Sequence, residues 1–83
     1  MTNYLIAKNQ ETGRKLIDAM GADIREWKLL PYGGALLAGK SKTLVIISPN
    51  WESFSATERE TMRRWFAEDV PLQMARSEIV IEV

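Results

Sequence analysis

The chain has 83 residues with neither cysteine nor histidine, which excludes disulfides, thiolate chemistry, the usual zinc sites and the commonest general base. Its 11 basic residues balance 11 acidic ones, so no global field attracts nucleic acid, anionic lipid or an acidic partner. The length and a hydrophobic content of 46% indicate one globular domain, residues 1–83. No apolar run approaches the ~18 residues of a membrane span, and no secretory leader is visible, so we expect a cytoplasmic protein. We also expect neither cofactor nor metal, since the usual zinc ligands are absent.

The first two elements are predicted to be a strand at Asn3–Lys8 and a helix at Gln10–Met20. Asn9 offers its side-chain oxygen as an N-cap, and Gly21 supplies a C-terminal stop. Gly13 lies on the apolar side of this helix, where a glycine is unfavourable unless the helix must approach the sheet closely. We therefore expect close packing at Gly13.

A second strand is predicted at Arg25–Leu30, and the segment that follows it, Gly34–Ser41, matches the phosphate-binding P-loop pattern letter for letter. A working P-loop opens a helix, whereas here Thr43 starts a strand. We interpret the segment as an apolar turn at Ala35–Ala38 followed by a polar turn at Lys40–Lys42. No nucleotide is expected to bind there.

The strand predicted at Thr43–Ser48 is the centre of the fold. Leu44 to Ile47 are four consecutive apolar residues, which leaves the strand no solvent-facing side. Such runs are typical of parallel strands that helices cover on both faces.

The second half of the chain begins with a Ser55-x-x-Glu58 capping box, which predicts a helix at Ala56–Asp69. Val70–Ala75 is interpreted as a connection. The last segment, Glu78–Val83, alternates apolar with mostly acidic residues, and we predict an edge strand with one wetter face.

The predicted order is therefore strand, helix, strand, turn, strand, helix, strand, which indicates a single small α/β domain. We favour a Rossmann-like sheet of about four mainly parallel strands with two main helices. If Ala35–Ala38 paired with the central strand, the alternative would be a ferredoxin-like βαββαβ fold. The doubly buried central strand favours the parallel sheet, because a ferredoxin-like sheet leaves one face open.

Several short segments between Tyr4 and Trp51 follow one another in a characteristic order and spacing, here called the cadence. They are Tyr4–Ile6, Gly13–Leu16, Trp27, Leu37–Gly39, Val45–Ile47 and Trp51. This cadence resembles small phage-encoded Rossmann-like proteins of unassigned function. The resemblance implies an accessory protein that acts in the cytoplasm of an infected bacterium by binding a host or phage component. It carries over no catalytic residue.

Ligands of open parallel sheets bind beyond the carboxyl ends of the strands. The sequence places Asn9, Gln10 and Thr12 after the first strand and Ser48 after the central strand. These residues also suit caps and turns. A small-ligand or nucleotide site here is therefore an alternative function.

Tryptophan and arginine are enriched in interface hot spots, and both occur in the second half of the chain. The interface candidates are Asn50, Trp51, Glu52, Arg59, Arg63 and Arg64. Trp51 is expected to be partly exposed, either as an anchor for a partner or folded back over the second helix. The arginines also suit a solvated helix face, or, as a second alternative, nucleic acid.

We therefore expect a small non-catalytic accessory protein that acts by protein–protein binding. The identity of the partner and self-association are left open.

Overall fold

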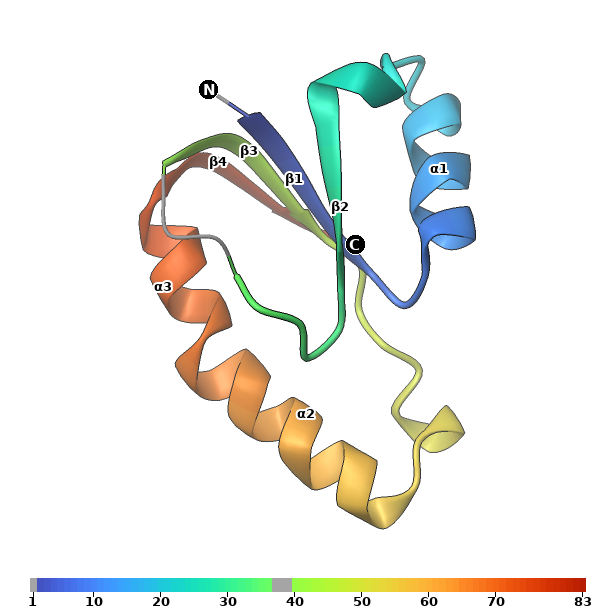
Figure 1. Ribbon diagram of the computed structural model, residues 1–83, viewed down its shortest axis with the longest axis vertical. Coiled ribbons are helices and arrows are strands. Elements are labelled where there is room, and N and C mark those ends of the chain that lie inside the picture. Colours follow the sequence, from blue (N-terminus) through green and yellow to red (C-terminus); the bar gives the residue numbers. More distant parts are fainter. Residues whose placement is uncertain (1, 37–39) are drawn as a thin grey trace.

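The computed structural model of the protein describes residues 2–36 and 40–83 (Figure 1). A sheet of four strands in the order β2-β1-β3-β4 forms its centre, and every strand pair is parallel. The strands are β1 (Thr2–Ala7), β2 (Trp27–Pro31), β3 (Ser41–Ile46) and β4 (Ser77–Glu82), and the helices are α1 (Gln10–Ala19), α2 (Ala56–Glu68) and α3 (Val70–Ala75). The predicted Rossmann-like arrangement is confirmed, and the antiparallel ferredoxin-like alternative is excluded.

The two central strands, β1 and β3, are buried on both faces, as predicted for β3. Leu5 and Leu44 have no exposed surface, and Val45 is 1% exposed. Leu5 pairs with Val45 in register, so the apolar runs of the two strands lie side by side. The core is therefore organised around this strand pair.

The start of β3 differs from the prediction. Ser41, expected in a polar turn, is the first residue of the strand and is completely buried. Its hydroxyl forms a hydrogen bond with that of Ser77 on β4, and Ser77 also donates to the Gln73 carbonyl at 2.7 Å. These bonds satisfy the buried hydroxyls, which explains how a serine can begin a core strand.

The P-loop look-alike is followed by a strand, as predicted, because Ser41 opens β3 and no helix begins there. Its central part, Leu37–Gly39, lies outside the described residues, and with it part of the predicted turn at Ala35–Ala38. The absence of nucleotide binding stays a prediction.

Helix α1 begins as the sequence predicts. The Asn9 side chain accepts a hydrogen bond from the Thr12 amide at 2.8 Å. A Cβ atom on Gly13 would lie 3.0 Å from Leu29 Cδ2 and 3.2 Å from Leu5 Cδ2. The glycine therefore lets α1 approach β1 and β2 closely, which confirms the expected packing.

Helix α3 is an element that the sequence reading missed, because Val70–Ala75 was interpreted as a connection. Pro71 is tolerated in the first turn of a helix, where its missing amide has no partner to lose. Val70 is 2% exposed and packs in the core beside α2. The interpretation as a connection is wrong, because burial of Val70 stabilises a short helix that local signals do not reveal.

The helices divide between the two faces of the sheet (Figure 1). Helices α2 and α3 cover one face, here called the α2 face, where Ile6, Leu44 and Ile46 meet Met62 and further core residues. Helix α1 packs through Ile17 on the opposite face, here called the α1 face. It lies over β1 and β2. Strand β4 is at the edge of the sheet, as predicted, and Ile79 and Ile81 on the apolar side of its alternation are exposed.

Candidate functional site

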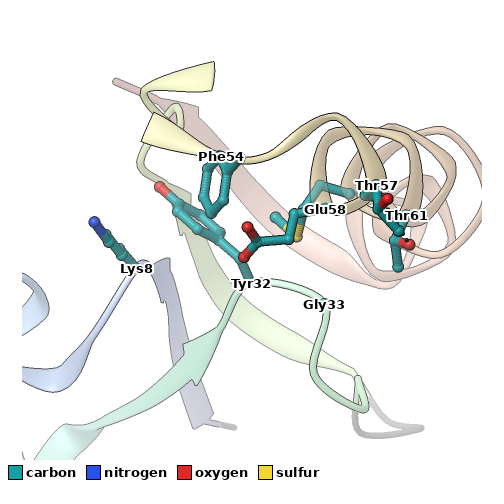
Figure 2. A pocket seen from close by; sticks show the side chains of 8 residues that line it. Lys8, Tyr32, Gly33, Phe54, Thr57, Glu58 and Thr61 are labelled. Carbon is teal, nitrogen blue, oxygen red and sulfur yellow. Dashed lines mark hydrogen bonds between the residues drawn. The ribbon is translucent and has the colours of Figure 1, made fainter. Parts of the chain in front are cut away.

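A cavity of about 500 Å³ lies at the carboxyl ends of the strands, between the segment after β2 and the first turns of α2 (Figure 2). Tyr32 and Phe54 form aromatic walls, while Thr57 and Glu58 line it from α2. Lys8, which directly follows β1, also lines the cavity. We call this cavity the carboxyl-edge pocket. Parallel sheets usually bind ligands at the carboxyl end of the strand from which the sheet is extended in both directions. Here that strand is β1, because β2 lies on one side of it and β3 on the other.

Tyr32 is held firmly in its place as a wall of the pocket. Its hydroxyl donates a hydrogen bond to the Ile47 carbonyl, and its ring centroid lies 6.4 Å from that of Phe54 and 5.9 Å from that of Phe66. Burial raises the pKa of Tyr32 above its usual range, because the phenolate would lose solvation. Tyr32 is therefore a neutral, preorganised wall.

Glu58 supplies a carboxylate to the same pocket. Its Oε1 accepts a hydrogen bond from the Ser55 amide at 3.0 Å, and Ser55 Oγ accepts one from the Glu58 amide at 3.2 Å, which confirms the predicted capping box. The bond from the Ser55 backbone is the main reason why the pKa of Glu58 is lowered, and the charge of Lys8 adds to the effect. The pocket thus carries an ionised carboxylate from α2, and Lys8 lines it from the segment after β1.

The predicted ligand residues at this edge do not line the carboxyl-edge pocket. Asn9 and Gln10 line a smaller cavity of about 180 Å³, and the Asn9 oxygen is engaged by Thr12. Ser48 is exposed, and its amide donates to the Val83 carbonyl at 2.8 Å. The sequence does not identify Tyr32 and Phe54 as residues of a ligand site. For Tyr32 a signal was present, because it directly follows β2 and so lies at the carboxyl end of a strand.

The carboxyl-edge pocket offers polar groups and aromatic surfaces to a ligand. Among residues 2–36 and 40–83, no cluster of three or more carboxylates is placed to hold a metal ion. The groups that are present suit a small ligand with both charged and apolar parts.

Trp51 is half-buried, in agreement with the expected partial exposure. Its ring centroid lies 5.7 Å from that of Phe66 and 6.3 Å from that of Phe54, and Arg63 Cζ lies 5.8 Å from it on the ring face. The indole therefore folds back onto α2 and the adjoining loop. Trp51 and Arg63 form a contact that the sequence did not predict.

The other interface candidates lie on the segment before α2 and on α2 itself. Asn50 and Glu52 are exposed on either side of Trp51. Arg64 is exposed on α2, and Arg59 is half-buried. Arg59 lines a hollow of about 270 Å³ together with Arg63. We call the six interface candidates, of which Arg63 contacts the indole, the Trp51 patch.

A third surface lies on the α1 face beside β4. Ile79, Ile81 and Val83 follow one another along this side of the strand and are 49%, 42% and 56% exposed. The side chains of β3 and β4 on this face are uncharged. They are Thr43 and Val45 on β3, and Ile79 and Ile81 on β4. In the described part of the chain no strand pairs with the outer side of β4. We call the three exposed apolar residues the β4 surface.

Comparison of the chain with protein-family models, curated proteins and solved structures finds no match. In the described residues, no helix is long and apolar enough to cross a membrane. The resemblance to phage proteins therefore depends on the sequence cadence alone.

Proposed function

We propose that the chain is a small protein-binding module and that its docking surface is the β4 surface. The observation that carries this proposal is the row of three exposed apolar side chains along an unpaired edge strand. Contiguous exposed apolar side chains are typical of protein-binding surfaces, and an open strand edge offers free backbone groups to a partner. Both features occur here on the same element.

The Trp51 patch is the weaker docking candidate. Trp51 already packs against Phe54 and Phe66, so part of its apolar area is withdrawn from any partner. Arg63 over its ring would have to be displaced or shared. The residues of the β4 surface have no such cover, so a partner would bury more new apolar area there.

The remaining parts of the proposal follow from the sequence. A non-catalytic role is supported by a composition without histidine or cysteine. A place in the cytoplasm of a bacterial host, with a host or phage component as partner, is supported by the cadence of the segment from Tyr4 to Trp51.

Two substitutions test the docking surface directly. Ile79→Ser with Ile81→Ser should reduce capture of the partner by about tenfold or more, because two apolar contacts are lost. Leu72→Ser is the matched control, because Leu72 is 59% exposed on α3, which covers the opposite face of the sheet from the β4 surface. Affinity capture followed by titration of the captured protein gives the measurement, with circular dichroism as the check of folding. Undiminished binding by the folded double variant would move the site to the Trp51 patch.

A second candidate function is small-ligand binding in the carboxyl-edge pocket. Its volume of about 500 Å³ lies within the usual ~300–1,000 Å³ of ligand sites, and its place at the strand ends favours it. Free amino acids and nucleotides can be screened by ligand-observed NMR. Phe54→Ala should abolish any signal and Lys40→Ala, in the P-loop look-alike, should leave it unchanged. The reverse result would place the ligand at the look-alike.

A further inference from the structure

Strand β4 carries opposite chemistry on its two sides. Glu78 and Glu82 are exposed on the α2 face and flank Val80, which is half-buried there. No ion pair engages either carboxylate within residues 2–36 and 40–83. The other side of β4 is the apolar β4 surface. A binding partner must therefore suit two acidic groups and three apolar ones along a single strand.

We infer that the partner adds a strand beside β4, with basic side chains on the side of Glu78 and Glu82 and apolar side chains on the side of the β4 surface. This inference rests on the proposed function of protein binding. In an antiparallel register centred on Val80, two basic residues four positions apart would lie opposite the two glutamates. Opposite charges in directly facing positions stabilise a strand pair.

Strand addition is favoured over flat docking because the apolar area is small. Three side chains, each already about half-buried, fall far short of the ~1,200 Å² that stable interfaces bury. An added strand also forms main-chain hydrogen bonds along the free edge, which supply affinity that the side chains lack. The edge and the apolar row would then act together.

A second copy of this chain fits the edge poorly in the registers centred on Val80 and Ile81. Antiparallel self-pairing centred on Val80 places Glu78 directly opposite Glu82 of the other copy, twice. Self-pairing centred on Ile81 places each Glu82 opposite Val80 and diagonal to both glutamates of the other copy. Like charges in these positions destabilise a strand pair, so in both registers the edge disfavours a second copy and favours a strand with basic side chains.

One substitution converts this repulsion into attraction. In the register centred on Val80, Glu82→Lys places a lysine opposite Glu78 of the second copy on both sides of the two-fold axis. The natural chain should sediment as a monomer, and Glu82→Lys should form a dimer at least about tenfold tighter than any self-association of the natural chain. Rising salt should weaken the dimer, because exposed charge pairs are screened.

The double variant Glu78→Lys/Glu82→Lys gives a second measurement. It should be monomeric alone and should form a 1:1 complex when mixed with the natural chain. A matched control, Glu60→Lys/Glu68→Lys, introduces the same charge change on exposed positions of α2 and should not pair with the natural chain. Analytical ultracentrifugation with circular dichroism of each sample reports association and folding together.

The outcomes separate this inference from the proposed function. A folded Glu82→Lys chain that stays monomeric, a natural chain that dimerises, or a control that pairs equally well would overturn strand addition. If Ile79→Ser/Ile81→Ser nevertheless loses the partner, protein binding stands and the partner docks in another way. If Glu82→Lys dimerises while the β4 substitutions leave partner capture unchanged, the edge has the stated charge preference, but the partner does not add a strand there and the docking site moves to the Trp51 patch.

Discussion

The two faces of the sheet share the same strands but differ in cover. On the α2 face, two helices and an aromatic cluster enclose the apolar side chains, so that Ile46 is 4% exposed. On the α1 face, α1 lies over β1 and β2, and Ile81 of β4 is 42% exposed. Both isoleucines have an apolar partner on an adjacent strand, Ile6 for Ile46 and Val45 for Ile81. The contribution of such a residue to stability is therefore set by what covers its face, and the uncovered half is free to bind.

The largest expected effect comes from breaking the covered face. Ile46→Ala should lower the free energy of unfolding by ~2–5 kcal/mol, because apolar burial is lost and a cavity remains. Ile81→Ala is the matched change on the uncovered face and should cost about 1 kcal/mol, because Ile81 is 42% exposed and loses less buried area than Ile46. Urea unfolding measures both. Similar losses at the two positions would show that the α1 face is as closed as the α2 face.

Trp51→Ala should have an intermediate effect. The indole is half-buried against Phe54 and Phe66, so we expect a loss of roughly 2 kcal/mol, below the ~3–5 kcal/mol of a fully buried aromatic residue. Thermal and urea unfolding provide the measurement. Unchanged stability together with weaker partner binding would identify Trp51 as an anchor and would favour the Trp51 patch over the β4 surface.

The parts of the fold that local signals encode were predictable from the sequence. The apolar run from Leu44 to Ile47 predicted the doubly buried centre, and the Ser55–Glu58 box predicted the start of α2. Alternation in the last strand predicted the edge. Strand ends were displaced by one or two residues. At Ser41 the cause is a hydrogen bond to Ser77, which is distant in sequence.

The parts that depend on tertiary contacts were not predictable. Helix α3 is stabilised by burial of Val70, which its proline-containing sequence does not reveal. The carboxyl-edge pocket brings Tyr32 together with Phe54, residues from segments that only the fold places side by side. The exposure of Ile79 and Ile81 depends on where α1 lies, and periodicity carries no information on that.

A smaller effect is expected at Tyr32, which lines the carboxyl-edge pocket and is hydrogen-bonded to the segment after β3. Tyr32→Phe removes the hydrogen bond to the Ile47 carbonyl while keeping the ring contacts, and should cost about 1 kcal/mol of stability. The raised pKa of Tyr32 adds a pH signature. Neutral tyrosine stabilises the fold, and this contribution is lost as the pH rises above the ordinary tyrosine pKa of about 10. The natural chain should therefore lose more stability in alkali than Tyr32→Phe, as measured by urea unfolding across that range.

The smallest expected effect concerns Glu58, at the start of the helix that closes the covered face. Its pKa is lowered in the folded state, chiefly by the Ser55 amide, so its charge contributes stability above the ordinary glutamate pKa of about 4.3. That contribution is lost as the pH falls through the lowered value. Glu58→Gln keeps a capping-box side chain but removes the charge. The stability difference between the natural chain and Glu58→Gln should therefore shrink as the pH is lowered. Glu60→Gln removes one charge from the same helix without touching the cap and serves as the control in urea unfolding at each pH. A difference between Glu58→Gln and the natural chain that stays constant from neutral to acidic pH would show that the cap acts through geometry alone.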